Sequence, residues 1–310
     1  MTDADAPPAL TSNVTDTALV FEGGGMRGSY TSGAVTALLE AGLHLDYVTG
    51  ISAGSSHTCN YLARDAERGR RSFVDFAADP QFGSYRTFLR GEGLFNARYI
   101  YEETGLPHQV LPFPWDRFSA NPARLQIGAF HCESGEPAWF GREDVPTLQD
   151  LMVRVRASST MPIVMPPTTI DGETYVDGAL GPGGGIPLDA AERDGFTKFL
   201  VVLTRPRDYV KRAERRPGLY RRWFRRWPAV AEGLVARPAN YTRTRERIWE
   251  LEREGRAMVF VPEQMPVSNG TKDIRRLHAA YDMGLAQARR ELPAWREFLG
   301  VDTDPTRAHG

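Results

Sequence analysis

Apolar residues recur along the chain in short runs that end at glycine or small polar residues. The run TALVFEG (17–23) has the continuous apolar character of a strand buried on both faces. Residues 28–40 continue as a mostly apolar helix, for which Gly42 supplies a stop signal. A second short strand, LDYVTG (45–50), leads directly into a second helix. This order of strand, turn and helix predicts a parallel sheet with helices on its faces.

The rest of the chain extends the same pattern without repeats or a low-complexity linker. We therefore predict one three-layer α/β/α fold with a mainly parallel central sheet. The further expected elements are mixed helix and loop at 66–120, strands at 124–132 and 137–141, a helix at 147–160, a hairpin around Asp171-Gly172, a strand at 198–206, a mostly helical Arg/Trp-rich segment at 205–256, a strand at 257–263 and a terminal helix at 271–299. We also predict a disordered tail at 1–15 and an extension, 205–310, packed on the same domain.

Composition and charge exclude few classes of function. The formal net charge is −1 over 310 residues, so nothing global favours nucleic acid as a partner. Cys59 and Cys132 lie far apart and form no CxxC pair, which argues against a zinc site or a disulfide framework. The first residues lack the apolar core of a signal peptide, and no apolar run reaches about 18 residues. A cytoplasmic protein is the expectation.

The second predicted strand ends on Gly50-Ile51-Ser52-Ala53-Gly54, a G-x-S-x-G sequence at a strand-to-helix corner. Such an elbow lifts the serine hydroxyl clear of the sheet, and small flanking residues let helix and strand pass closely. Ser52 is therefore a candidate nucleophile, although a tight turn with a helix-capping serine would have the same spelling. No histidine is an evident base, because His57 lies one and a half turns into the same helix.

The glycine-rich stretch GGGMRG (23–28) follows the first strand and precedes the first helix. Its spacing fits the dinucleotide fingerprint, but Asp46 opens the second strand instead of closing it. A Walker loop would need a lysine that is absent here. Because consecutive β-α turns of a parallel sheet open at the same edge, the amides of Gly24, Gly25 and Met26 should lie beside Ser52. We therefore predict that they form an oxyanion hole.

An aspartate also stands at the end of a predicted strand, in TYVDGAL. Asp177 is followed by Gly178, whose small size would let another segment approach the carboxylate. An Asp-Gly turn, as at Asp171-Gly172, is the alternative.

Together, GGGMRG (23–28), GISAG (50–54) and DGA (177–179) resemble the ordered motifs of the patatin-like phospholipase family. The lead-in ASSTMPIVMPPTTIDGETYVDGAL is also similar to that family, and the resemblance covers roughly residues 17–204. The family has DGG more often than DGA, and both occur. Residues 205–310 resemble its bacterial members only loosely. The resemblance implies the patatin-like fold and, for 17–204, a catalytic domain.

The resemblance also implies a mechanism. It assigns Ser52 as the nucleophile and Asp177 as the base, with no histidine, cofactor or metal. The implied reaction is hydrolysis of lipid carboxylic esters through an acyl-enzyme. Arg27 matches a basic position of the family and would brace the loop or lie near a phosphate. Supporting roles fall to the motif glycines Gly23, Gly28, Gly50, Gly54 and Gly178.

Residues 205–227 carry ten basic and two acidic side chains with interleaved aromatics. This composition is typical of a segment that lies on an anionic membrane surface. It also fits a solvated basic face whose aromatics pack on the core. No nucleic-acid recognition motif accompanies it. Two other functions remain open: a non-catalytic lipid- or partner-binding protein on the same scaffold, and a nucleotide-binding protein at the glycine loop.

Overall fold

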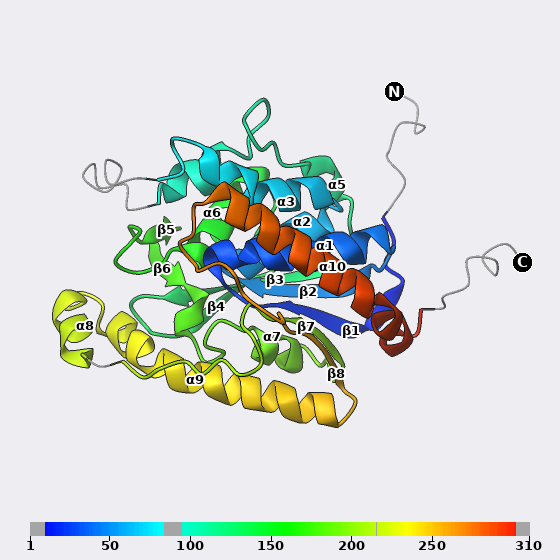
Figure 1. Ribbon diagram of the computed structural model, residues 1–310. Coiled ribbons are helices and arrows are strands. Elements are labelled where there is room, and N and C mark those ends of the chain that lie inside the picture. The colour runs from blue at the N-terminus through cyan, green and yellow to red at the C-terminus, as the bar shows by residue number, and fades with distance from the viewer. Residues whose placement is uncertain (1–9, 84–94, 215, 302–310) are drawn as a thin grey trace, which may run out of the picture.

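A mixed sheet lies between two layers of helices in the computed structural model, which describes residues 10–83, 95–214 and 216–301 (Figure 1). Within these residues the sheet has eight strands in the order β5-β6-β3-β2-β1-β7-β8, with β4 paired to β3 beside this path. The strands are β1 (Val14–Phe21), β2 (Leu45–Ile51), β3 (Arg124–His131), β4 (Pro137–Phe140), β5 (Thr168–Ile170), β6 (Glu173–Asp177), β7 (Phe199–Val202) and β8 (Ala257–Phe260).

Parallel pairing dominates the centre of the sheet. Strand β1 pairs in parallel with β2 and β7, β2 with β3, and β7 with β8, whereas β4, β5 and β6 add antiparallel pairs. Phe21 lies opposite both Gly50 and Val202, so β1, β2 and β7 end at one edge of the sheet. The mostly parallel α/β fold predicted from the sequence is confirmed, and this edge carries the candidate site.

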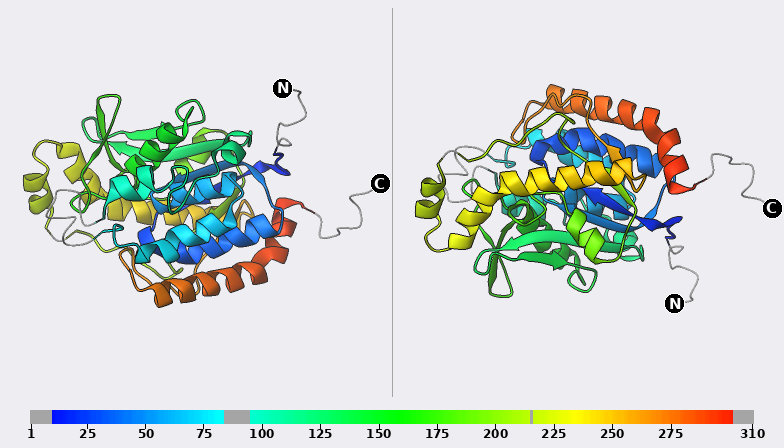
Figure 2. Two further views of the ribbon diagram at one scale, coloured as in Figure 1. Left: turned by 90° about the horizontal axis from the view of Figure 1, so that it is seen from above. Right: turned by 90° about the horizontal axis from the view of Figure 1, so that it is seen from below.

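Helices cover both faces of the sheet (Figures 1 and 2). Helices α1, α2, α3 and α10 lie on one face, and α7 and α9 on the other. Tyr281 of α10 donates a hydrogen bond to Thr36 of α1 at 3.2 Å. The helices are α1 (Gly28–Glu40), α2 (Ala53–Leu62), α3 (Ala66–Phe73), α5 (Trp115–Ser119), α6 (Leu148–Ser159), α7 (Leu188–Arg193), α8 (Pro217–Trp223), α9 (Pro228–Arg253) and α10 (Ile274–Leu299), with short turns η1 (Gly25–Arg27), η2 (Asp75–Ala78), η3 (Tyr99–Glu103) and η4 (Gly178–Leu180).

The structure differs from the sequence expectations mainly at element ends. Strand β1 already begins at Val14, inside the tail predicted at 1–15, because Val14 pairs with Leu45 of β2. Residues 1–9 of that tail lie outside the described residues. In the extension, β8 joins the sheet and α10 packs on α1. The Arg/Trp-rich segment becomes helical only from Pro217. None of the helices in the described ranges has an apolar stretch that would span a bilayer.

Candidate active site

Ser52 stands at the sharp turn between β2 and α2, in a strained backbone conformation. Its φ of 57° and ψ of −124° are unusual for a residue other than glycine. Its amide donates to the Ser158 hydroxyl at 2.9 Å, and that hydroxyl donates to the Gly128 carbonyl at 2.6 Å. A Cβ on Gly54 would lie 2.3 Å from the Phe21 carbonyl oxygen, so the elbow needs glycine there. These features match a nucleophile elbow.

Strand β3 brings the two sequence-distant motifs together. Ile51, next to the elbow, lies opposite Gly128 in the parallel β2–β3 pair. One residue further along β3, Ala129 lies opposite Asp177 in the antiparallel β3–β6 pair. Asp177 therefore ends β6 beside Ser52.

The carboxyl of Asp177 is buried and held in place. Its Oδ1 accepts a hydrogen bond from the Ala179 amide at 2.9 Å, and its own amide donates to the Thr160 carbonyl at 2.8 Å. Burial raises the pKa of Asp177 above its usual value, and the positive charge of Arg237 opposes this shift. The nearby Ser52 hydroxyl acts in the same direction as Arg237. Ser52 and the Asp177 carboxyl thus lie close together at this edge of the sheet.

The glycine loop lies directly over this elbow. In this conformation the Met26 amide donates to the Asn269 carbonyl at 3.0 Å, so one of the three expected oxyanion donors is engaged. Among the described residues the amides of Gly24 and Gly25 have no acceptor, and they remain the predicted donors. The tight packing extends to the other motif glycines, because a Cβ would come within 2.1 to 2.9 Å of a heavy atom at Gly23, Gly28, Gly50, Gly54 and Gly178.

Arg27 is linked to the glycine loop through Thr204, which follows β7. It is 7% exposed, and its Nε donates to the Thr204 hydroxyl at 3.4 Å. Thr204 in turn donates to the Gly23 carbonyl at 3.2 Å. Burial lowers the pKa of Arg27 to about 10; the charge of Arg205 adds to this shift, and that of Glu22 opposes it. These contacts fit the bracing role, one of the two alternatives from sequence.

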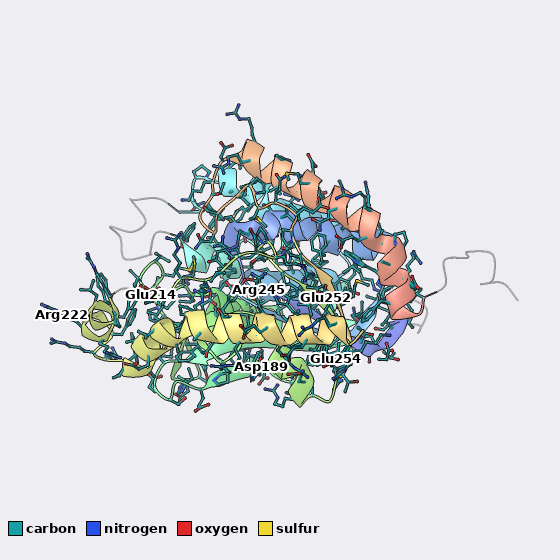
Figure 3. All side chains as sticks on the ribbon, turned by 60° about the horizontal axis from the view of Figure 1, so that its bottom comes forward. Asp189, Glu214, Arg222, Arg245, Glu252 and Glu254 are labelled. Carbon is teal, nitrogen blue, oxygen red and sulfur yellow. The ribbon has the colours of Figure 1, made fainter. Side chains whose placement is uncertain are left out.

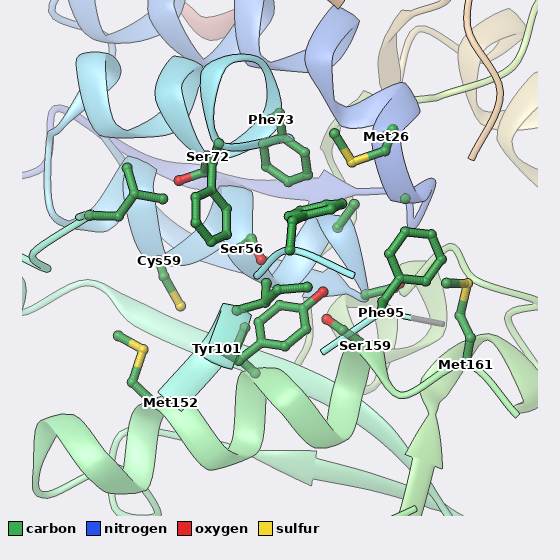
Figure 4. A pocket seen from close by; sticks show the side chains of 18 of the residues that line it. Met26, Ser56, Cys59, Ser72, Phe73, Phe95, Tyr101, Met152, Ser159 and Met161 are labelled. Atoms are coloured by element: carbon green, nitrogen blue, oxygen red, sulfur yellow. The ribbon is translucent and has the colours of Figure 1, made fainter. Parts of the chain in front are cut away.

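An apolar pocket opens beside Ser52 and encloses about 910 Å³, its open mouth included. Figure 4 shows Cys59 and Met152 toward one end and Met161 toward the other. Among the described lining residues the one cation, Arg68, is partly buried and donates to Asn60 Oδ1 at 2.6 Å and to the Leu111 carbonyl at 3.3 Å. The pocket is thus mostly apolar along its described lining. The aromatic and aliphatic lining residues include Phe73, Phe76, Phe82, Phe95, Ile100, Tyr101, Leu111, Phe113, Val155 and Met165.

The histidine nearest in sequence takes no part in the site. The Nε2 of His57 hydrogen-bonds the Thr31 hydroxyl at 2.8 Å, and its ring packs against Phe21 and Phe73. Complete burial lowers the pKa of His57 to about 3, so the ring stays neutral. His57 is a core residue, as expected from its position in α2.

One cluster on the surface could supply metal ligands. Ligand atoms of His131, Glu133 and Glu173 all lie within 4.8 Å of one another. However, His131 Nε2 already lies 2.6 Å from Glu173 Oε2, a contact that a hydrogen bond explains without a metal.

Comparisons with known proteins show what this chain is similar to. The chain matches the family model of patatin-like phospholipases over residues 19–191 and a domain of unknown function, DUF6363, over 227–300. It is 27% identical over 194 residues to the uncharacterized protein YjjU of Escherichia coli K12, covering 61% of this chain and 52% of that protein. The chain thus spans about half the length of that curated relative.

Two solved structures are similar to this chain. VipD from Legionella pneumophila has a TM-score of 0.49 and 14% identity, over 90% of this chain and 67% of that one. Human GIVD cytosolic phospholipase A2, solved with methyl gamma-linolenyl fluorophosphonate, has a TM-score of 0.50 and 13% identity, over 93% of this chain and 58% of that one. At such identities the likeness concerns the fold alone. The family model covers more than half of the 310 residues, so the chain belongs to the patatin-like phospholipase family.

Proposed function

We propose that this protein is a serine acyl hydrolase that cleaves carboxylic esters of lipids through a Ser52–Asp177 dyad. The observation that carries the proposal is the strained Ser52 beside the buried carboxyl of Asp177, at the mouth of an apolar pocket. Membership of a phospholipase family supports the reaction class. The pocket supports an acyl chain as the group that is bound.

The proposed reaction has two halves. Asp177 takes the proton of Ser52 as its Oγ attacks the ester carbonyl, and the amides of Gly24 and Gly25 stabilise the oxyanion. The alcohol leaves with the proton from Asp177, so an acyl-enzyme remains. Asp177 then deprotonates a water that attacks the acyl carbon, and it passes that proton to the Oγ of Ser52 as the fatty acid departs. No cofactor or metal enters these steps.

The test is ester hydrolysis by Ser52→Ala and Asp177→Asn with p-nitrophenyl butyrate. Each substitution should lower kcat by about a thousandfold or more, because both groups act in both halves of the reaction. Asp171→Asn is the matched control, since Asp171 belongs to the same hairpin and its side chain is 89% exposed. Near wild-type rates in Ser52→Ala or Asp177→Asn would refute the dyad.

We further propose that the exposed part of the 205–227 segment touches anionic lipid. Trp223 is 69% and Leu219 57% exposed, and Arg222 lies on α8 at the far end of the molecule (Figure 3). Trp223 also lines a groove with Met165, which lines the active-site pocket as well. Other aromatics of the segment, such as Phe224, pack inward instead.

Binding to vesicles that contain phosphatidylglycerol tests this contact, with neutral phosphatidylcholine vesicles as the control. We expect binding that weakens as salt rises and that falls in Trp223→Ala. Binding that ignores salt, or no binding, would refute it.

A further inference from the structure

One cation, Arg68 of α3, lies among the described side chains that line the pocket of Ser52. Most of the other described lining residues are aromatic, aliphatic or sulfur-containing. A charge in such surroundings is costly unless hydrogen bonds and an opposite charge compensate it. The partners of Arg68 therefore indicate what it does in the pocket.

The described chain uses only part of the hydrogen-bonding capacity of Arg68. Its Nη1 donates to Asn60 Oδ1 at 2.6 Å, and its Nε donates to the Leu111 carbonyl at 3.3 Å. A guanidinium has five N–H groups, and among the described residues those of Nη2 have no acceptor. The edge formed by Nη1 and Nη2 can therefore donate to a ligand.

The positive charge of Arg68 also lacks an ion-pair partner. In the part of the chain that the structure describes, no carboxylate oxygen lies within 4 Å of its side-chain nitrogens, whereas Arg70 of the same helix meets Glu67 at 2.8 Å. The carboxylate of Asp65 accepts from the backbone amide of Arg68 instead, at 2.9 Å. Burial lowers the pKa of Arg68 to about 10, so the group stays charged at neutral pH.

Helix α2 separates Arg68 from the catalytic serine. Ser52, Ser56 and Cys59 all line the pocket, and their spacing places them along one face of this helix. Because an α-helix rises about 1.5 Å per residue, Cys59 lies about 10 Å beyond Ser52 along that face. Burial raises the pKa of Cys59 to about 12, and the nearby charge of Arg68 opposes this shift. Arg68 therefore lies near the Cys59 end of the face.

Contacts with other lining residues place the guanidinium of Arg68 at the same end of the pocket. Its Cζ lies 4.9 Å from the centre of the Phe113 ring. A Cβ on Gly105 would lie 3.8 Å from Arg68 Nη2 and 3.1 Å from Met152 Sδ. Met152 and Cys59 lie together at one end of the pocket (Figure 4). The Nη2 group is thus close to the end that an acyl chain extending from the catalytic serine would reach.

We propose that Arg68 binds a carboxylate at the far end of the acyl chain, which makes half-esters of dicarboxylic acids the preferred substrates. The ester lies at Ser52, the methylene chain follows the apolar lining, and the terminal carboxylate meets Nη1 and Nη2 of Arg68. Arginine suits this role because its planar guanidinium can donate to both carboxylate oxygens at once. An unsubstituted acyl chain would instead place its methyl end against a cation without an ion-pair partner in the described chain. This inference names a substrate class for the proposed hydrolase and rests on that function.

The test compares two esters of equal chain length. The p-nitrophenyl hydrogen octanedioate ends in a carboxylate, and p-nitrophenyl octanoate ends in a methyl group. Release of p-nitrophenolate, with the uncatalysed rate subtracted, gives kcat/KM for each, and the ratio of the two values is the readout. We expect the wild type to prefer the octanedioate by about 10-fold or more, because only that ester forms charge-assisted hydrogen bonds with Arg68. A wild-type preference for the octanoate would overturn the proposal.

Substitution of Arg68 should reverse this preference. Arg68→Gln should lower the ratio by about 100-fold or more, because the carboxylate would then enter an apolar pocket without a cation. Both rates come from one preparation, so a smaller folded fraction cancels in the ratio. Arg71→Gln is the matched control, since Arg71 is an exposed arginine of the same helix that donates to the Val110 carbonyl at 2.8 Å. It should keep the wild-type ratio, and an unchanged ratio in Arg68→Gln would overturn the proposal.

Chain length gives a second test that needs no variant. The same comparison is made with p-nitrophenyl hydrogen hexanedioate and p-nitrophenyl hexanoate. The shorter chain ends before it reaches Arg68, so the preference for the carboxylate should be clearly smaller than with the octanoyl pair. An equal preference at both lengths would show that the overall charge of the site selects the anion, and it would overturn the assignment to Arg68.

A binding measurement separates this proposal from the hydrolase function. If the wild type cleaves none of these esters, the hydrolase proposal fails, and the shift in Tm caused by methyl hydrogen octanedioate becomes the readout. A rise in Tm that Arg68→Gln abolishes and Arg71→Gln keeps supports the carboxylate site. No rise, or a rise that Arg68→Gln keeps, overturns it.

Discussion

The two sides of Ser52 differ sharply in character. On one side, α2, α3 and α6 form a pocket lined mostly by aromatic and aliphatic side chains. On the other, η1, the segment after β7 and α9 gather four cations without a carboxylate partner within 4 Å in the described chain. Adjacent residues divide between them, since Met26 lines the pocket and Arg27 is one of the four cations, with Arg205, Lys211 and Arg237. The difference teaches that the residues around Ser52 separate an apolar environment from a positively charged one.

The largest effect within this comparison should come from a substitution at Gly25, in the glycine loop between the two sides. Gly25 has a φ of +54°, and a Cβ there would lie 2.5 Å from the Asn269 carbonyl oxygen. Gly25→Ala should therefore displace the predicted oxyanion donors and lower kcat by about 100- to 1000-fold on every ester. Steady-state kinetics with one short and one long ester measure it.

Gly42→Ala is the control for backbone strain. Gly42 has a φ of +65°, but nothing lies within 4 Å of its Cβ position. It should lose about 1–2 kcal/mol of folding free energy and keep its activity. If Gly25→Ala loses no more activity than Gly42→Ala, the glycine loop has no part in catalysis.

A smaller, one-sided effect should follow from filling the pocket. Met152→Trp would shorten the space for the acyl chain at the end where Met152 and Cys59 lie (Figure 4). We expect kcat/KM for p-nitrophenyl decanoate to fall about 10- to 100-fold while that for the acetate changes less than about threefold. Met283→Trp, on the exposed face of α10, is the matched control. Equal losses on both esters would show that the chain does not bind there.

The smallest expected effect is a change in folding stability at Asp177, whose carboxyl is influenced both by burial and by the nearby cations. Burial raises its pKa, and the cations only partly offset this, so the ionised carboxylate destabilises the folded state at pH values above its folded pKa. Asp177→Asn should therefore have a higher Tm than the wild type at pH 7. The difference should shrink as the pH falls through the folded pKa of Asp177, where the wild type takes up the proton. Thermal melts of both proteins from pH 7 to pH 4 measure it, with Asp171→Asn expected to show no such trend.

The sequence allowed most of the central fold to be predicted, because its signals are local. The apolar run of β1 and the stop at Gly42 each depend on a few neighbouring residues. Ser52 and Asp177 could be paired because the family's ordered motifs supply what local patterns lack. The start of β1 was missed because Val14 is ordered by pairing with Leu45, a contact across 31 positions.

The supporting residues of the site had no signal in the sequence. The Ser158 hydroxyl accepts a hydrogen bond from the Ser52 amide, 106 residues away in the sequence. The carbonyl of Asn269, which belongs to the extension, accepts one from the Met26 amide. Lys211 and Arg237 looked like members of an exposed basic stretch and an ordinary helix. Only the folding of α9 over the sheet turns them toward the glycine loop. Long-range packing, which no local pattern encodes, decides these contacts.

The most direct test of the central claim is the site of covalent labelling by a fluorophosphonate with a long alkyl chain. Its phosphorus would react with the activated serine while its chain enters the pocket. Intact-mass and peptide mass spectrometry should show one adduct, on Ser52, that Ser52→Ala abolishes and Asp177→Asn slows. A folded wild-type protein that stays unlabelled, or that carries the adduct on Ser56 or another serine, would contradict the account.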